Sequence, residues 1–338
     1  MVDGRIDGSI DRRVDMSHEQ SLEPDSPFHR RFYVYTQERF PLLGHGLLIV
    51  SYYSSNSLLG QVLTDPETPL HYDRGSLFGA ITLFCFFFHL RVFDEHKDFA
   101  DDSQHYPDRV LQRGLVTLRQ LTMIGLIAIG LELLLAGLWR PRGDFAPLVA
   151  VVVALAYSLL MLKEFFLSRW LADRFLLYAV SHMLIMPLLA MIPFSFATGH
   201  YLWDAPPWFW WYAFVGFFVT FNWEVSRKIR APSDEATGVE TYSGLFGPRR
   251  AATIVLVIRL IDTAMVAAVG RHLGLSMWFY VAIIAMLLAT LFSYVRFYQN
   301  QTAGAAKTLE KVAGMYIIAF DLALAVELIR KFGVTLHW

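Results

Sequence analysis

Apolar stretches long enough to cross a bilayer recur along most of the chain. A spanning helix needs roughly 20 mostly apolar residues, and such a stretch satisfies its backbone in lipid only when it is helical. The repeated segments of alternating polarity that a transmembrane barrel requires are not seen in the sequence. The pattern therefore predicts an all-α integral membrane protein with nine spans, at residues 41–60, 75–93, 117–138, 146–163, 175–198, 206–224, 251–270, 275–295 and 313–330.

The first 38 residues differ from the rest of the chain. Residues 1–28 are rich in Asp, Arg, Ser and Gly, which predicts a disordered tail rather than a secretory signal. A basic and aromatic segment follows, including Arg31, Phe32 and Arg39, and it is typical of a short helix on a membrane surface. We therefore expect a tail with an interfacial segment at 1–38 and a transmembrane domain at 39–338.

The basic residues are distributed unevenly between the two sides of the predicted bundle. The N-terminal tail and the connections that face the same side carry 21 Lys and Arg, whereas the opposite side carries six. By the positive-inside rule, the side with 21 is cytoplasmic. We expect the N-terminus and the long polar loops to be cytoplasmic and the C-terminus to lie on the opposite side.

The composition agrees with a membrane protein. Of 338 residues, 55% are hydrophobic and only 17% are charged, and the mean hydropathy is +0.40; soluble domains carry roughly 25% charged residues. The net charge of −1 does not bear on nucleic-acid binding, because the charges are segregated along the chain. We expect a lipid bilayer and no nucleic acid among the partners. One cysteine, Cys85, excludes a disulfide within one chain.

The strongest chemical signal follows the second predicted span. Asp94, Asp98 and Asp102 recur every four residues, so they share one face if the helix continues beyond the apolar run. Stacked carboxylates repel each other unless a cation bridges them, and oxygen ligands of this kind suit Mg²⁺. Arg91 and Lys97 lie within the same stretch, and the mixture of acid and base suits a metal–diphosphate site. The alternative is a solvated acidic loop.

A second group of charged residues follows the sixth predicted span. Its basic residues Arg227 and Lys228 suit phosphate binding, and Glu224 or Asp234 is placed to reach a second metal. The alternative is an ordinary basic cap at the end of a helix. The turn-rich segment 238–247 that follows is consistent with an ordered cap.

Some ionisable residues fall inside the predicted spans, where burial of charge is costly. We expect Lys163 to lie near the cytoplasmic end of its span. His182 is as consistent with hydrogen-bonded packing as with an active site, and Arg259 and Asp262 are expected to pair with each other or with a neighbour. Glu132 and Asp321 are further candidates.

These features resemble the UbiA superfamily of intramembrane prenyltransferases over nearly all of residues 40–330. The first family motif reads Asn-Asp-x-x-Asp-x-x-x-Asp, and this chain has Asp94, Glu95, Asp98 and Asp102 at those positions. Residues 107–114 are similar to the family's Arg-Pro-x-x-x-Gly continuation, with Val110 where proline is usual. Residues 238–247 are similar to the segment after the second acidic motif.

The resemblance implies a helical bundle around a central cavity and a Mg²⁺-dependent transfer of the prenyl group of a polyprenyl diphosphate to an aromatic or lipid acceptor. It implies that Asp94, Asp98 and Asp102 are catalytic through the metal. Five basic residues are the implied diphosphate-binding groups, namely Arg109, Arg113, Lys163, Arg227 and Lys228. Further implied metal ligands are Glu95, Glu224 and Asp234.

The second motif departs from the family pattern. Glu224 and Lys228 stand where the family usually has Asp-x-x-x-Asp, and a protonated lysine cannot ligate Mg²⁺. Either Asp234 or Glu235 substitutes, or Arg227 and Lys228 bind diphosphate directly. Two other activities stay open: a membrane terpene cyclase, in which a double bond of the donor attacks the allyl cation, and a transporter with a cytoplasmic cation site.

Overall fold

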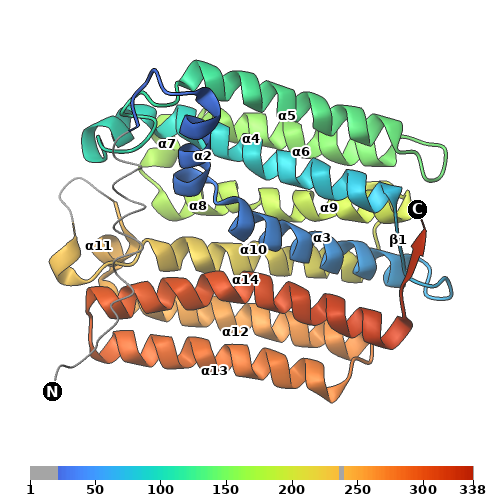
Figure 1. Ribbon diagram of the computed structural model, residues 1–338. Coiled ribbons are helices and arrows are strands. Elements are labelled where there is room, and N and C mark those ends of the chain that lie inside the picture. Colours follow the sequence, from blue (N-terminus) through green and yellow to red (C-terminus); the bar gives the residue numbers. More distant parts are fainter. Residues whose placement is uncertain (1–21, 236–239, 338) are drawn as a thin grey trace, which may run out of the picture. The chain divides into compact units, whose positions relative to one another are not determined.

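The computed structural model describes residues 22–235 and 240–337, and each of the nine predicted spans contains a helix (Figure 1). The predicted tail at residues 1–21 lies outside the described residues. The long helices are α3 Leu42–Thr64, α4 Arg74–His105, α5 Leu118–Leu138, α6 Ala146–Leu162, α9 Ile185–Thr198, α10 Pro207–Arg227, α12 Pro248–His272, α13 Met277–Gln299 and α14 Ala303–Phe332. The shorter elements are α2 Phe28–Arg39, η1 Glu164–Phe166, α7 Ser168–Ala172, α8 Phe175–Met183, η2 Leu202–Asp204, η3 Pro232–Asp234 and α11 Tyr242–Phe246.

Six stretches of the described residues are long and apolar enough to cross a membrane. Five of them are α4, α5, α12, α13 and α14, and the sixth runs from Phe175 to Thr198. The helix α6 is apolar but has only 17 residues, while α3 carries several Ser, Asn and Gln residues and α10 many Trp and Tyr residues, which lower their hydropathy. A multi-pass membrane protein is confirmed, and the count of nine spans stays a prediction.

The fifth predicted span is interrupted. It forms α8 and α9, with Leu184 between them. Pro187 lies just beyond this point, and proline has no N–H to bond the carbonyl of residue 183. The break is therefore the local consequence of one proline in an otherwise continuous apolar run.

The second span is longer than predicted. The predicted span ends at residue 93, and whether the helix continues beyond it was left open; α4 continues through the acidic stretch to His105 and has 32 residues. At 1.5 Å per residue this length is about 48 Å, well beyond the roughly 30 Å hydrocarbon core. The acidic residues are therefore on the helix itself.

The chain divides into two compact units. Unit 1 comprises Met1–Gly46 and Cys85–Gly130, and unit 2 comprises Leu47–Phe84 and Leu131–Trp338. The helix α2 belongs to unit 1, where Val34, Tyr35 and Thr36 are buried. A helix is present where the interfacial segment was predicted, and the predicted division after residue 38 stays a prediction.

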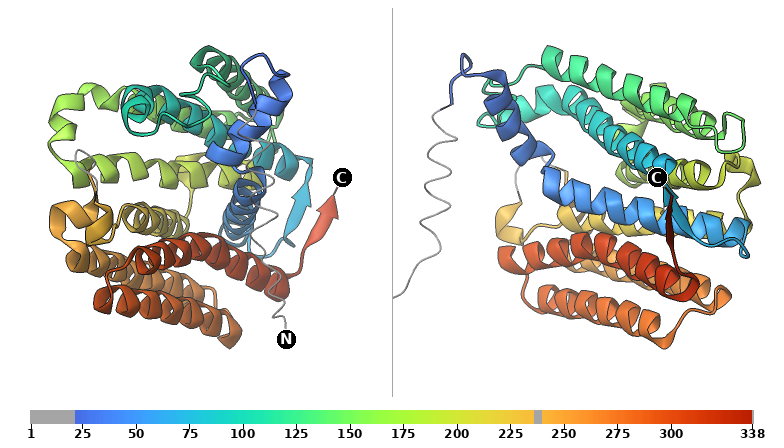
Figure 2. Two further views of the ribbon diagram at one scale, coloured as in Figure 1. Left: turned by 60° about the vertical axis from the view of Figure 1, so that its left-hand side comes forward. Right: turned by 45° about the vertical axis from the view of Figure 1, so that its right-hand side comes forward.

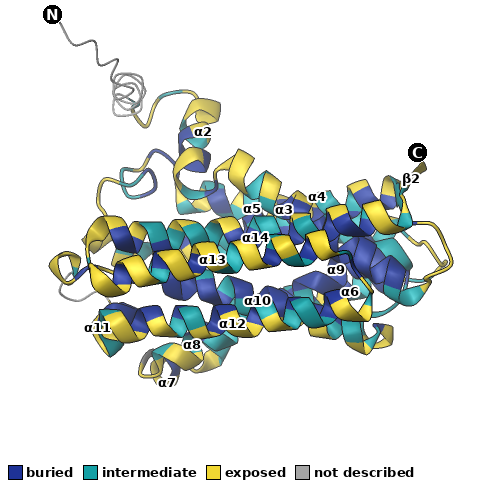
Figure 3. Ribbon diagram, turned by 90° about the horizontal axis from the view of Figure 1, so that it is seen from below, coloured by how far each residue is buried: buried dark blue, intermediate teal, exposed yellow. Residues whose placement is uncertain are grey.

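Unit 2 contains the larger set of packed helices. The helix α10 lies at its centre and packs against α9, α12 and α14, while α13 packs against α12 and α14 (Figure 1). The outer helix α13 exposes apolar side chains along its whole length (Figure 3). These are Met277, Trp278, Val281, Ile284, Leu288, Leu291, Phe292 and Val295. A helix with such a face requires lipid rather than water around it.

Unit 2 also contains two short strands that the all-α prediction did not include. β1 His71–Asp73 pairs in parallel with β2 Thr335–His337, with His71 opposite Thr335 (Figure 2). Asp73 then caps α4, because its carboxylate accepts a hydrogen bond of 2.9 Å from the backbone N–H of Ser76. The strand pair joins the C-terminal end of the chain to the beginning of α4.

Close contact between a glycine and a tryptophan gives a test of this packing. A Cβ atom added to Gly75 would lie 2.0 Å from the ring of Trp139, whose Nε1 donates to the carbonyl of Phe196 at 3.0 Å. We expect Gly75→Ala to lower the midpoint of thermal unfolding, since overpacking costs about 1–3 kcal/mol. Differential scanning fluorimetry of the purified protein measures this midpoint.

The matched control is Gly130→Ala on α5, where an added Cβ meets no atom within 4 Å. Alanine is the better helix former, so this variant should keep or slightly raise the midpoint. Equal midpoints for Gly75→Ala and the unmodified protein would contradict the contact with Trp139.

Candidate functional site

The acidic residues of α4 lie on one face of the helix, as the four-residue spacing predicts. Because α4 is continuous from Arg74 to His105, each step from Asp94 to Asp98 and from Asp98 to Asp102 turns the side chain by only about 40°. Asp94 and Asp98 are exposed, and Asp102 is half-buried. Asp98 forms no hydrogen bond or ion pair with the described residues. This face therefore presents carboxylate oxygens outward.

Glu95, next to this face, has a different environment. Its side chain is 1% exposed and accepts from Nε of Arg39 at 2.7 Å and from Nη2 of Arg91 at 2.8 Å. Arg39 comes from α2, so the ion pair holds α2 against α4 within unit 1. Both oxygens of Glu95 are thus engaged by guanidinium groups, and its role as a metal ligand stays a prediction.

Asp102 connects the same cluster to the loop after α4. Its Oδ2 accepts a hydrogen bond from Arg109 and another from Arg39 at 3.3 Å. The guanidinium of Arg109 also stacks 3.9 Å from the ring centre of Tyr106. The predicted metal ligand Asp102 and the predicted diphosphate-binding Arg109 are therefore brought together. Sequence reasoning missed Arg39, although its basic and aromatic segment was a signal.

The loop beyond Arg109 is ordered by contacts inside unit 1. The Arg113 side chain donates to the carbonyl of Leu22 at 3.3 Å, and the N–H of Val110 donates to Glu38 of α2 at 3.2 Å. Gly114 closes the loop with a φ of +72°, a value that favours glycine. Arg109 and Arg113 are consequently held on one short ordered segment directly after the acidic helix.

Tyr35 shows how tightly α2 is packed here. It is fully buried, and burial, followed by the negative charge of Glu95, raises its pKa. A protonated phenol next to Glu95 adds no charge to the cluster. Two arginines therefore balance the Glu95 and Asp102 carboxylates, with Arg109 as the third cation.

The donor set of this face suits a metal that is shared with a ligand. In residues 22–235 and 240–337, no three His, Cys, Asp or Glu side chains are grouped so that they could hold a metal ion by themselves. Mg²⁺, however, usually binds through one or two carboxylates together with phosphate oxygens and water. Asp94 and Asp98 supply two exposed carboxylates of the required type.

The second predicted group lies in unit 2, at the end of α10. Glu224 is 5% exposed, and its carboxylate accepts from Nε of Arg227 at 2.6 Å and pairs with Nζ of Lys228 at 2.9 Å. Lys228 also lies 5.0 Å from the ring centre of Phe175. Glu224 is therefore paired with two cations, and its role as a metal ligand stays a prediction.

An ordered cap follows these residues. The N–H of Tyr242 donates to the carbonyl of Lys228 at 3.1 Å, and the N–H of Arg230 donates to Ser243 at 2.7 Å. Burial and then the charge of Glu224 raise the pKa of Tyr242, so its phenol stays protonated. The predicted cap is present for residues 240–247, while 238 and 239 lie outside the described residues.

Two of the predicted residues stand apart from this group. Asp234 is exposed and accepts a hydrogen bond of 2.9 Å from Ser233. Lys163 is exposed at the end of α6 and forms no ion pair with the described residues. It precedes three residues with positive φ, Glu164, Phe165 and Phe166, at 47°, 54° and 60°. Such backbone is strained for side-chain-bearing residues.

Three of the ionisable residues inside the spans, Arg259, Asp262 and His182, contact neighbouring side chains. Arg259 and Asp262 are both fully buried and pair at 2.8 Å, as predicted, and Arg259 also donates to Asn222 at 3.1 Å. His182 stacks on Tyr178, with ring centres 4.0 Å apart.

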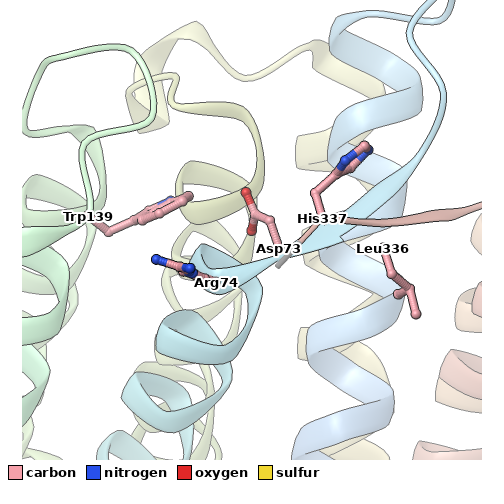
Figure 4. Close-up of a pocket in the computed structure, with 5 residues that line it drawn as sticks. All are labelled: Asp73, Arg74, Trp139, Leu336 and His337. Atoms are coloured by element: carbon pink, nitrogen blue, oxygen red, sulfur yellow. The ribbon is translucent and has the colours of Figure 1, made fainter.

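A pocket of about 430 Å³ lies elsewhere in unit 2 and contains none of the predicted site residues (Figure 4). Its lining residues are Asp73, Arg74, Trp139, Leu336 and His337.

Comparisons with known proteins agree on one family. The model of the UbiA prenyltransferase family matches residues 58–318. Among the curated proteins, none gives a significant match.

Solved structures with the same fold include a UbiA homolog from Aeropyrum pernix K1 without ligand, at 15% identity and a TM-score of 0.61, covering 82% of this chain and 96% of that one. A structure from work on digeranylgeranylglyceryl phosphate synthase in membranes has 12% identity and a TM-score of 0.61, with coverages of 89% and 99%. A UbiA homolog from Archaeoglobus fulgidus bound to DMAPP and Mg²⁺ has 15% identity and a TM-score of 0.51, with coverages of 85% and 98%.

The contrast between Glu95 and Asp98 predicts different consequences for stability. Glu95→Gln removes the carboxylate that Arg39 and Arg91 share and leaves Arg39 with Asp102 alone, and we expect a loss of roughly 2–3 kcal/mol, below the roughly 3–5 kcal/mol of a fully buried pair because both arginines are partly exposed. Asp98→Asn removes an exposed carboxylate and should change stability by less than about 0.5 kcal/mol. Thermal unfolding of both variants measures the difference, and a Glu95→Gln protein as stable as Asp98→Asn would contradict the positioning role.

Proposed function

Because the chain belongs to the UbiA prenyltransferase family, we propose that it is a Mg²⁺-dependent intramembrane prenyltransferase that ionises a polyprenyl diphosphate at the acidic face of α4. The observation that carries this proposal is the separation of roles on one helix. Glu95 is buried and paired, whereas Asp94 and Asp98 are exposed on a shared face. Asp102, hydrogen-bonded to Arg109, extends that face toward the basic loop.

In this proposal Asp94, Asp98 and Asp102 hold Mg²⁺ on the diphosphate, and the metal supplies charge neutralisation when it is bound. Arg109 and Arg113 bind diphosphate oxygens from the ordered loop after α4. A guanidinium has five N–H donors, so Arg109 keeps donors for phosphate while it bonds Asp102. The proposal gives Glu95 a positioning role only.

We assign Arg227 and Lys228 of unit 2 to the same reaction on chemical grounds. The C–O bond of the donor breaks with its electron pair on the diphosphate, and fixed positive groups stabilise that developing charge. Glu224 holds Arg227 and Lys228 in defined positions, and each keeps N–H donors beyond those that Glu224 accepts. Lys163 is assigned the same role, supported by its exposed charge and the family resemblance; Asp234 stays a candidate second metal ligand.

The remaining steps follow from prenyl chemistry. The allyl cation forms a bond with a nucleophilic atom of the acceptor, an aromatic ring or a lipid, and the acceptor then loses a proton. We further propose that the N-terminus and the acidic end of α4 face the cytoplasm, since 21 of the 29 Lys and Arg residues fall on that side.

The acidic face is tested by one exchange on α4. We expect Asp98→Asn to lower diphosphate release from a prenyl diphosphate by about 100-fold or more, because the loss of a charge-stabilising group at a reacting centre typically costs 10²–10³ in rate. Release is measured on purified protein with Mg²⁺ and candidate acceptors. Asp108→Asn, an exposed carboxylate exchange in the following loop, is the control and should retain the activity. Unchanged release by Asp98→Asn would contradict the proposed site.

The same assay without an acceptor distinguishes transfer from cyclisation. The proposed transferase turns over only when an acceptor is added. A cyclic hydrocarbon or alcohol formed from the prenyl diphosphate alone would identify a membrane terpene cyclase and overturn the transferase assignment.

A further inference from the structure

A buried aspartate in unit 2 has no counter-charge. Asp321 on α14 is 1% exposed. Its Oδ1 accepts hydrogen bonds from Ser55 of α3 and from Tyr212 of α10, the latter at 2.8 Å. Its Oδ2 is buried and has no hydrogen-bond partner among the described residues. Burying a carboxyl oxygen without a partner is costly, so this atom requires an explanation.

Asn56, which shares the contact with Ser55, also has a buried side-chain oxygen without a hydrogen-bond donor within the described ranges. Asn56 on α3 is 1% exposed, and its Nδ2 donates to the carbonyl of Tyr52 at 2.9 Å and to Oγ of Ser55 at 3.4 Å. Its Oδ1 is buried without a donor among the described residues. Ser55 contacts both side chains, so two unsatisfied oxygens belong to one cluster.

Asp262, the other fully buried aspartate described in unit 2, differs from Asp321 because it has a cationic partner. Asp262 is as buried as Asp321, but it pairs with Arg259 at 2.8 Å and accepts from Tyr316 at 3.3 Å. In the described part of the chain, the partners of Asp321 are the neutral hydroxyl groups of Ser55 and Tyr212. One fully buried carboxyl thus has a protein cation and the other does not.

We propose that Asp321 and Asn56 form a site for one monovalent cation of the size of Na⁺ inside the helix bundle of unit 2. The donor set consists of carboxylate, amide and hydroxyl oxygens, which are ligands for hard cations. One positive charge balances the single carboxylate, and one ion satisfies both unpartnered oxygens. A divalent ion would leave an excess charge, and Mg²⁺ in particular retains several waters.

The cation site joins three helices that are distant in sequence. Asn56 and Ser55 belong to α3, Tyr212 to α10 and Asp321 to α14, so an ion held by this cluster stabilises their packing. A ligand that binds only the folded protein raises its stability with concentration. The inference is independent of prenyl transfer, because no candidate diphosphate-binding or Mg²⁺-binding residue is part of the cluster.

The test is the thermal unfolding of the full-length protein in detergent without Mg²⁺, in NaCl and in choline chloride at equal ionic strength. We expect NaCl to raise the midpoint by roughly 2–4 °C once its concentration is about ten times the dissociation constant. Asp321→Asn preserves the shape of the side chain and should abolish the difference between the two salts. Ser293→Ala, which removes a buried hydroxyl group on α13 outside the cluster, is the control and should keep it.

A second variant covers the case in which Asp321→Asn does not fold. Asn56→Leu keeps the approximate volume and removes Oδ1, so it should reduce the Na⁺ response by at least half. Equal midpoints in NaCl and choline chloride for the unmodified protein would overturn the proposal, as would a midpoint that changes with pH but not with Na⁺, which indicates a protonated carboxyl only. A Na⁺ response that persists in Asp321→Asn, or that Asn56→Leu reduces by less than half, would place the ion elsewhere and overturn it too.

Discussion

The pairing of Glu95 with Arg39 and Arg91 is the interaction on which the candidate site depends. A carboxylate that is 1% exposed is tolerated because two guanidinium groups engage both of its oxygens. The pair holds α2 against the side of α4 that carries Glu95. With Glu95 on the side that contacts α2, the four-residue spacing places Asp94 and Asp98 together on an exposed side of α4. The acidic face thus lies directly beside one buried ion pair.

The same division between paired and exposed charge recurs in unit 2. Glu224 is buried and neutralised, and its partners Arg227 and Lys228 are the groups that retain donors for a ligand. Arg259 and Asp262 neutralise each other completely inside a span. Because unpaired buried charge is expensive, the buried carboxylates of Glu95, Glu224 and Asp262 are each paired with a cation.

The sequence predicted the helices well, since each long apolar run has only one way to satisfy its backbone in lipid. It also predicted that Asp98 and its neighbours share a face. It did not predict the burial of Glu95, because the partner Arg39 is 56 residues away and only tertiary packing brings the two together. The pairing of Glu224 with Arg227 and Lys228 was also not predicted, although these partners are only three and four residues away. The pairing of β1 with β2, which lie far apart in the sequence, was not expected either. The spacing of charged residues along one helix could be predicted from the sequence, whereas ion pairs between residues far apart in the sequence could not.

The central claim is that carboxylates of α4 hold a divalent metal together with diphosphate, which is a shared-ligand site of the kind Mg²⁺ prefers. The most direct measurement replaces Mg²⁺ with Mn²⁺ and records pulsed electron–nuclear double resonance on the purified protein with a prenyl diphosphate analogue. The account predicts a ³¹P coupling from diphosphate bound to protein-held Mn²⁺, and its loss when Asp98 is changed to Asn. A ³¹P coupling of the same size and occupancy in both proteins would contradict it.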